Sequence, residues 1–185
     1  TVSGHSNEKL WSWSDSELRI GIPNAHPYTG PESVTQPLLA DLELDGTPEL
    51  IIAAVDTTTD EPTVVSLPLG LQTPEENWKV ALDRGSHPSD PAFAALDDNS
   101  GSIVLTTVDE LNGNFWIWQI DGPTGSLDWE RVSIQGTDDD DDTPRIRLPG
   151  PVITQLDSDA APEMIITLPS DENLADDGMG AQFIG

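Results

Sequence analysis

Pro37-Leu-Leu-Ala-Asp-Leu-Glu-Leu-Asp-Gly-Thr-Pro-Glu-Leu-Ile-Ile52 is a short apolar run, an acidic loop and a second apolar run in direct succession. The same pattern returns as Pro91-Ala-Phe-Ala-Ala-Leu-Asp-Asp-Asn-Ser-Gly-Ser-Ile-Val-Leu105 and as Pro151-Val-Ile-Thr-Gln-Leu-Asp-Ser-Asp-Ala-Ala-Pro-Glu-Met-Ile-Ile166. The aligned prolines lie 54 and then 60 residues apart. A repeat of roughly 50 residues built from strand, turn and strand is typical of a propeller or a similar array. The repeat therefore predicts an architecture more clearly than it predicts a reaction.

Strand signals dominate the rest of the chain. Short β-branched or aromatic runs bounded by Gly, Pro, Asn and Asp occur at 51–55, 63–67, 102–108, 114–120 and 164–168. No segment has a sustained apolar period of 3.6 residues, so helices are expected to be scarce. The 15 glycines and 16 prolines suit a chain with many tight turns. The sequence predicts an all-β fold.

A second repeated element is a tryptophan in a short amphipathic strand, at 9–14, 76–82 and 127–134. Each copy precedes the next proline-led run, as the outer strand of one propeller blade would precede the inner strand of the next. Inner strands are expected to be buried on both faces, and outer strands to carry the large aromatics between blades. Trp116 and Trp118 are expected on one face of a strand. They are interpreted as core between blades or, together with Tyr28, as aromatic surfaces for sugars.

The predicted fold is a β-propeller segment of about three four-stranded antiparallel blades. Residues 1–34 would hold the end of a preceding blade plus a loop, and 35–87 a blade with the best acidic loop. Residues 88–147 would form a second blade ending in the acidic run 138–142, and 148–185 would start a further blade. The chain is expected to be a segment of a longer one, because Thr1 begins no signal-peptide pattern and 178–185 resembles the start of another strand.

Composition narrows the possible partners. The chain has 34 acidic and 7 basic residues, a formal charge of -27. Such a surface repels nucleic acid and anionic lipid, and it suits surroundings rich in cations that screen self-repulsion. The alternative is a soluble acidic surface with no environmental meaning. There is no cysteine, so disulfides and thiolate metal sites are excluded. No apolar run approaches the roughly 20 residues of a membrane span, so no membrane insertion is expected in this segment.

The first acidic loop has the composition of a calcium site. It places carboxylates at positions 1, 3, 5 and 9 and glycine at position 6, which are Asp41, Glu43, Asp45, Glu49 and Gly46. Calcium takes six to eight oxygen ligands, and alternate residues of a tightly turned loop can point theirs inward. Gly46 would permit the turn, Thr47 would offer its carbonyl, and Glu49 would close the site from the next strand.

These residues resemble the FG-GAP or VCBS repeat, D-x-D-x-D-G-x-x-D/E followed by an apolar strand. The resemblance implies an integrin-α-type β-propeller in which the loop joins the first two strands of each blade. It also implies Ca²⁺ at the first loop. In the third copy Asp157, Asp159 and Glu163 are retained as ligands, while Gln155 and Ala160 depart from the pattern. In the second copy Ala95 replaces the first acid, Asp97 and Asn99 follow, and no acid closes the loop, which favours a solvated turn without metal.

One more motif supports the propeller interpretation. Residues 121–129, Asp-Gly-Pro-Thr-Gly-Ser-Leu-Asp-Trp, resemble the D-x-x-T-G-x-x-x-W turn of quinoprotein-type propellers, in which the tryptophan packs between blades. A single copy does not imply a quinone cofactor.

The sequence therefore favours a non-enzymatic extracellular or cell-surface module for adhesion, recognition or scaffolding, stabilised by calcium. Its partners would be a protein or glycan ligand at a surface and further blades from the same or another chain. One alternative is a fragment of a carbohydrate-active or quinoprotein-like propeller enzyme, since acid-rich loops could supply the two carboxylates of a glycosidase. Another is a subunit of an extracellular fibre or surface layer. Fold alone does not decide among them.

Overall fold

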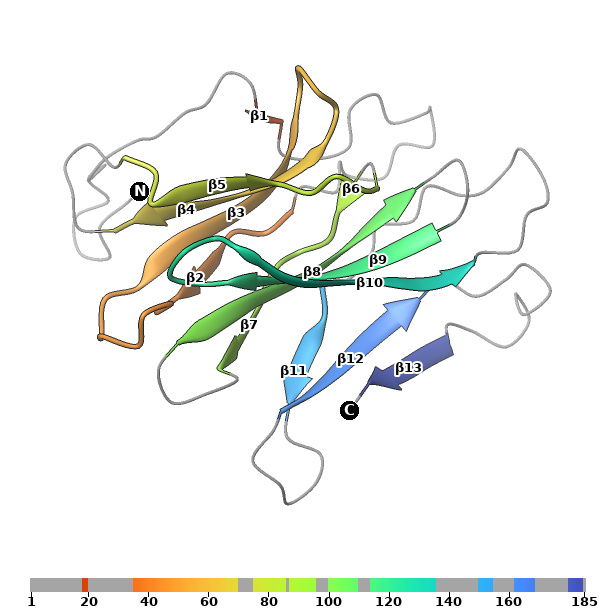
Figure 1. Cartoon of the computed structure of the whole chain (residues 1–185). Coiled ribbons are helices and arrows are strands. Elements are labelled where there is room, and N and C mark those ends of the chain that lie inside the picture. The colour runs from red at the N-terminus through yellow and green to blue at the C-terminus, as the bar shows by residue number, and fades with distance from the viewer. Residues whose placement is uncertain are drawn as a thin grey trace.

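The computed structural model describes residues 18–19, 35–69, 75–85, 87–95, 100–109, 114–135, 150–154, 162–168 and 180–184. Every regular element within these ranges is a β-strand, and all strand pairs are antiparallel (Figure 1). The predicted all-β fold is therefore confirmed. No segment of the described part forms a helix long and apolar enough to cross a membrane.

The first sheet follows the chain in simple up-and-down order. Its strands are β1 (Leu18–Arg19), β2 (Leu38–Ala40), β3 (Glu49–Asp56), β4 (Pro62–Pro68) and β5 (Trp78–Ala81). Strands β2, β3, β4 and β5 are successive neighbours. Strand β1 lies on the same edge of β3 as β2, because β2 pairs with residues 49–51 and β1 with residues 55–56. The sheet therefore has four strand positions across its width.

The second sheet repeats this order. It consists of β6 (His87–Pro88), β7 (Ala92–Ala95), β8 (Gly101–Asp109), β9 (Asn114–Asp121) and β10 (Leu127–Gln135). Strands β6 and β7 share one edge of β8, and β9 and β10 follow on the other side. The third sheet contains β11 (Val152–Thr154), β12 (Glu163–Leu168) and β13 (Gly180–Ile184), again in chain order.

The hairpin between β3 and β4 shows how local sequence produces these sheets. Both strands contain three β-branched residues, and Ile52 pairs with Val65. At the turn, Oδ1 of Asp56 accepts a hydrogen bond from the Thr58 N–H (2.8 Å), and Asp60 adopts a φ of 63°. Aspartate tolerates this left-handed conformation better than most residues. The residues between the two predicted strands therefore favour the turn of the hairpin.

The three sheets stack face to face. One core cluster joins the first sheet, through residues such as Ile51 and Val64, to Ile103 and Leu105 of the second sheet. A second cluster joins the opposite face of the second sheet to Met164 and Ile166 of the third sheet. The first strands of the three meanders lie side by side, with β7 in contact with both β2 and β11 (Figure 1).

The expectation that the innermost strands are buried on both faces is wrong. Leu39 of β2 and Ala95 of β7 are exposed. The middle strands are the ones buried on both sides: Val64 faces the second sheet and Val65 the opposite side, and both are fully buried. The reason is the position within each sheet, because each of the long middle strands has a neighbour on either side, whereas the short first strands form the rim of each sheet.

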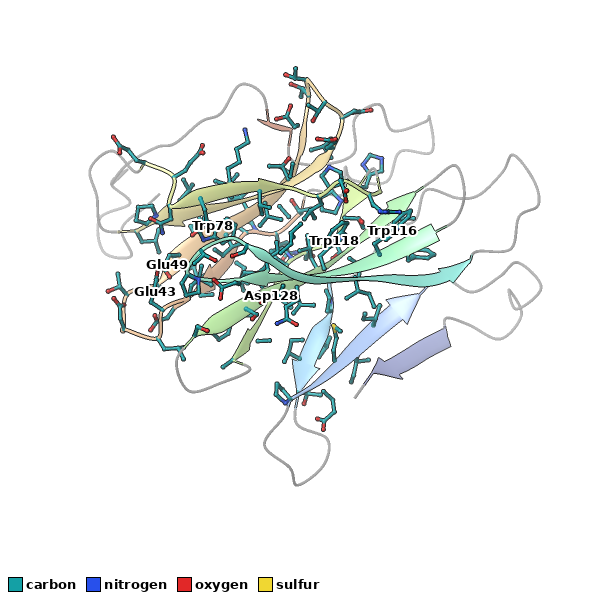
Figure 2. All side chains as sticks on the ribbon, viewed as in Figure 1. Glu43, Glu49, Trp78, Trp116, Trp118 and Asp128 are labelled. Carbon is teal, nitrogen blue, oxygen red and sulfur yellow. The ribbon has the colours of Figure 1, made fainter. Side chains whose placement is uncertain are left out.

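The three tryptophans whose side chains the structure describes lie between sheets, as one of the two interpretations predicted. Trp116 and Trp118 of β9 point to the same face and join the cluster between the first and second sheets (Figure 2). They are 6% and 0% exposed, so their proposed use as sugar-stacking surfaces is wrong. Trp78 of β5 packs against the same cluster from the first sheet. Tyr28 lies outside the described residues.

Candidate functional site

The acidic loop 41–49 connects β2 to β3, and its backbone turns sharply. Gly46 has a φ of 89°, which confirms that this glycine permits the turn. Leu44 has a φ of 56° although it carries a side chain. A left-handed conformation costs such a residue roughly 1–2 kcal/mol, so other contacts within the loop must hold it in place.

Two of the predicted calcium ligands supply those contacts. The Asp45 N–H donates to Oδ1 of Asp41 (3.0 Å), and the Gly46 N–H donates to Oδ2 of Asp41 (2.7 Å). Oδ1 of Asp45 accepts from the Thr47 N–H (2.8 Å). Asp41 and Asp45 therefore stabilise the loop by accepting hydrogen bonds from its backbone N–H groups. The spacing of the acidic residues did not predict this role. Each carboxylate oxygen keeps a second lone pair that could coordinate a cation.

Glu49 differs from the other acids of the loop because it is buried. The residue is 5% exposed, and its Oε2 accepts a hydrogen bond from the Leu42 N–H (2.9 Å). Burial raises the pKa of the Glu49 carboxyl, and the neighbouring Glu43, Asp41 and Asp45 carboxylates raise it further, against the lowering effect of the Leu42 hydrogen bond. The pKa of Glu49 is therefore raised both by its burial and by the other three carboxylates of the loop.

The loop is also fastened to the neighbouring sheet. Leu42 is 1% exposed in the core cluster, and its carbonyl accepts from the Gly101 N–H at the start of β8 (2.9 Å). The Gly101 carbonyl accepts from the Gly122 N–H (2.9 Å), and the Gly122 carbonyl accepts from Nε1 of Trp78 (2.7 Å). We call this the inter-sheet chain. It runs from Glu49 through Leu42, Gly101 and Gly122 to Trp78, so it leaves the first sheet, crosses the second and returns.

The turn between β9 and β10 is the D-x-x-T-G motif identified in the sequence. Asp121 Oδ1 accepts from the Thr124 N–H (3.0 Å), and Gly125 has a φ of 71°. A Cβ at Gly125 would lie 2.7 Å from the ring of Trp78. The tryptophan that packs on this turn is therefore Trp78 of the first sheet. The tryptophan of the sequence motif is Trp129, and its side chain lies outside the described part.

Only part of the predicted third site lies within the described residues. Asp157 and Asp159 fall outside them, as do Asp97 and Asn99 of the second loop and the acidic run 138–142. Glu163 begins β12 and pairs with Thr154, as Glu49 begins β3 and pairs with Ala40. Glu163 therefore holds the place in the third sheet that Glu49 holds in the first.

The donor chemistry of the first loop suits a hard cation, since Asp41, Glu43, Asp45 and Glu49 offer only oxygen. Within the described ranges, however, no three acidic or histidine side chains are placed to hold a metal ion. Asp41 and Asp45 are instead oriented toward backbone N–H groups of the loop. In the described part of the chain, the loop is therefore a turn held by hydrogen bonds from its own backbone to Asp41 and Asp45.

Comparison with protein-family models, with curated proteins and with solved structures found no match to this chain. The resemblance to FG-GAP repeats consequently depends on the residues quoted in the sequence analysis alone.

The raised pKa of Glu49 leads to a prediction about pH. A carboxyl whose folded-state pKa lies above its ordinary value of 4.5 favours folding when protonated, and that contribution is lost as pH rises through the raised pKa. Glu49→Gln cannot ionise but keeps an oxygen for the Leu42 N–H. In chelator, we expect Glu49→Gln to have a higher melting temperature than wild type at pH 7, with the difference shrinking as pH falls toward 4.5.

The exposed Glu75 provides the control, since Glu75→Gln removes the same charge from another loop and leaves the carboxylates around Glu49 in place. Comparing each variant with wild type at every pH removes the common titration of the other acids. A difference in melting temperature between Glu49→Gln and wild type that does not depend on pH would contradict the conclusion that the pKa of the buried Glu49 carboxyl is raised.

Proposed function

We propose that this chain is part of a β-propeller that serves as a non-enzymatic module for adhesion, recognition or scaffolding outside the cell. The supporting observation is the repetition of one arrangement. Two successive four-position meanders have the same strand order, they pack face to face, and their first strands lie beside that of a third sheet. Meanders of this kind form the blades of a propeller when they are repeated around a central axis, and the FG-GAP resemblance of the loops agrees with this proposal.

The same arrangement supports a role in binding. The acidic loop 41–49 leaves the rim of the first sheet, and its tip is exposed from residue 43 to residue 48. Loops on a rigid scaffold are the usual carriers of recognition. The formal charge of -27 supports a cation-rich, extracellular or surface environment and disfavours nucleic acid as a ligand. The proposed ligands are therefore a protein or a glycan at a surface.

The function is tested by binding and turnover on the same samples. The 185-residue chain is presented to glycan and extracellular-protein arrays in millimolar Ca²⁺ and in chelator. Saturable binding without chemical change of the ligand supports the proposal. Saturable turnover that a single carboxylate substitution abolishes would replace it with the enzymatic alternative, whose support from Trp116 and Trp118 is lost through their burial.

We further propose that Ca²⁺ binds to Asp41, Glu43, Asp45, Thr47 and Glu49, and to Asp157, Asp159 and Glu163 in the third repeat. The first loop concentrates four carboxylates, three of which raise the pKa of the fourth. A cation would relieve this repulsion. Because the Leu42 carbonyl of the same loop is bonded to Gly101, an ion held there would also stabilise the junction of the first and second sheets.

Calcium binding is checked by thermal melting at high fixed ionic strength, so that general screening is constant. Millimolar Ca²⁺ should raise the stability of wild type, by roughly 2.7 kcal/mol when free metal is about a hundred times the dissociation constant. Asp45→Ala should abolish the gain, because Asp45 contributes both a ligand and the Thr47 N–H contact. Glu75→Ala, which removes an exposed acid from another loop, should retain it. Equal melting with Ca²⁺ and with chelator would mean that the loop is only an acidic turn.

A further inference from the structure

Two Asp–Gly pairs lie in the described part of the chain, and both are in turns. Asp45–Gly46 is at the tip of the acidic loop 41–49, and Asp121–Gly122 opens the turn between β9 and β10. In such a pair the glycine nitrogen can attack the side-chain carboxyl of the preceding aspartate and close a five-membered succinimide ring, because glycine has no side chain to obstruct it. The ring then opens to aspartate or to isoaspartate. The same reaction is therefore available in two different surroundings.

The surroundings of Asp45–Gly46 favour this reaction. Both residues are exposed, and a Cβ at Gly46 would meet nothing within 4 Å. The Gly46 N–H donates to Oδ2 of Asp41 (2.7 Å). The attacking nitrogen is therefore already in contact with a carboxylate that can take its proton, at the distance that general base catalysis requires.

The surroundings of Asp121–Gly122 oppose the same reaction. Gly122 is buried, and a Cβ there would lie 2.3 Å from the Gly101 carbonyl oxygen, so the backbone has little room to move. The Gly122 N–H donates to that carbonyl (2.9 Å), which is a far weaker base than a carboxylate. Ring closure at Asp121 would also have to break this buried hydrogen bond.

The two aspartate carboxyls themselves are similarly placed. Oδ1 of Asp45 accepts from the Thr47 N–H (2.8 Å), and Oδ1 of Asp121 accepts from the N–H (3.0 Å) and the hydroxyl of Thr124. A donor at this oxygen stabilises the negative charge that develops there during attack. The difference between the two pairs therefore lies in the base that contacts the glycine nitrogen and in the room around it.

We propose that Asp45 is a modification site at which the folded chain converts aspartate to isoaspartate, with the Asp41 carboxylate as the general base. The reactive form of Asp45 is its protonated carboxyl. The Gly46 nitrogen forms a bond to Cγ of Asp45 while Asp41 takes the proton from that nitrogen. Asp41 then returns the proton to the hydroxyl on Cγ, the Cγ–O bond breaks and water leaves. Asp41 ends as a carboxylate again, and no other reactant is consumed.

Water then opens the ring at either of its two carbonyls. Cleavage between the nitrogen and Cγ restores Asp45, whereas cleavage between the nitrogen and the main-chain carbonyl carbon leaves Gly46 joined through Cγ. The second product adds one atom to the main chain and moves the Gly46 and Thr47 N–H groups away from the carboxylates that accept from them. Isomerisation therefore loosens the loop. It does not depend on the proposed function, because it needs neither Ca²⁺ nor a ligand.

The test follows isoaspartate in the folded 185-residue chain during incubation at mildly acidic pH in chelator. Peptide mapping with electron-transfer fragmentation locates each isoaspartate, which is necessary because Asn112–Gly113 and Asp177–Gly178 lie outside the described residues. Isoaspartate is expected to accumulate at Asp45 about tenfold faster than at Asp121, or more. In the chain unfolded by urea this difference should disappear, because neither environment remains.

Asp41→Asn tests the general base directly. Asparagine keeps an oxygen for the loop N–H groups but is no base at this pH, so isomerisation at Asp45 should slow by about tenfold. Glu43→Gln is the matched control, since it removes the same charge from an exposed position of the same loop and leaves the contact between Asp41 and Gly46 in place. Its rate should stay close to that of wild type. Unchanged far-ultraviolet circular dichroism checks that both variants fold.

A merely structural role for Asp41 predicts the opposite direction, because a loosened loop would isomerise faster. Unchanged or faster isomerisation in Asp41→Asn would therefore overturn the proposal. Equal rates at Asp45 and Asp121 in the folded chain would do the same, as would a Glu43→Gln variant that slows as much as Asp41→Asn.

Discussion

Trp118→Ala is expected to lower the free energy of unfolding by about 3–5 kcal/mol, the cost of removing a large aromatic side chain from a packed core. Trp118 is fully buried in the cluster between the first and second sheets, and its Nε1 donates to Oγ1 of Thr107 (2.8 Å). The substitution would leave a cavity at the junction of two sheets and remove that hydrogen bond. Since whole domains are stable by only roughly 5–15 kcal/mol, this one change should bring the chain close to unfolding.

The measurement is denaturant unfolding followed by far-ultraviolet circular dichroism, which does not depend on the deleted fluorophore. Two phenylalanine variants separate the effect of the cavity on stability from the effect of the lost hydrogen bond. Trp118→Phe loses the bond to Thr107, whereas Trp116→Phe removes an N–H that is buried without a hydrogen-bond partner. Trp118→Phe should therefore cost more than Trp116→Phe. A loss below about 1 kcal/mol for Trp118→Ala would show that the two sheets do not depend on this contact for stability.

Gly122→Ala is expected to destabilise the chain by about 2–4 kcal/mol, combining overpacking with lost hydrogen bonds. An added Cβ would lie 2.3 Å from the Gly101 carbonyl oxygen and 3.0 Å from the Leu42 side chain. A backbone oxygen cannot rotate away, so the turn must move. Movement would break the bond from the Gly122 N–H to Gly101 and the bond from Trp78 to the Gly122 carbonyl.

Gly46→Ala is the matched control for this effect. A Cβ at Gly46 meets nothing within 4 Å, but its φ of 89° is unfavourable for alanine, which should cost about 1–2 kcal/mol. Amide hydrogen exchange separates the two cases more sharply than stability does. Gly122→Ala should speed exchange of the Gly101 N–H, since that amide belongs to the same inter-sheet chain, and Gly46→Ala should change it little. Equal exchange at Gly101 in both variants would mean that the chain of bonds is not coupled.

The inter-sheet chain connects the acidic loop to the contact between the first and second sheets. Leu42 links the loop to the second sheet by its carbonyl and to Glu49 by its N–H. A change in the charge or occupancy of the loop would therefore be transmitted to the contact between sheets as well as to the hairpin that carries it. This is why the pH and calcium experiments measure the stability of the whole fold.

Part of the candidate site could be predicted from sequence, because it depends on neighbours along the chain. The turn at Gly46 and the position of Glu49 at the start of a strand follow from spacing and turn chemistry. The hydrogen bonds of Asp41 to backbone N–H groups were missed, although they are also local. An aspartate at the first position of a loop can serve either a metal or the backbone, and residue types alone do not choose between them.

The sequence by itself determined that the chain is all-β and that it repeats, since β-branched runs, turn residues and the spacing of prolines are local properties. Only the tertiary structure decided which strands are buried on both faces, and which tryptophan lies on the turn after β9. Trp78 reaches Gly122 across 44 positions of sequence. Contacts of this kind depend on how one sheet is placed on the next, and that placement is set jointly by many apolar side chains whose individual patterns look alike.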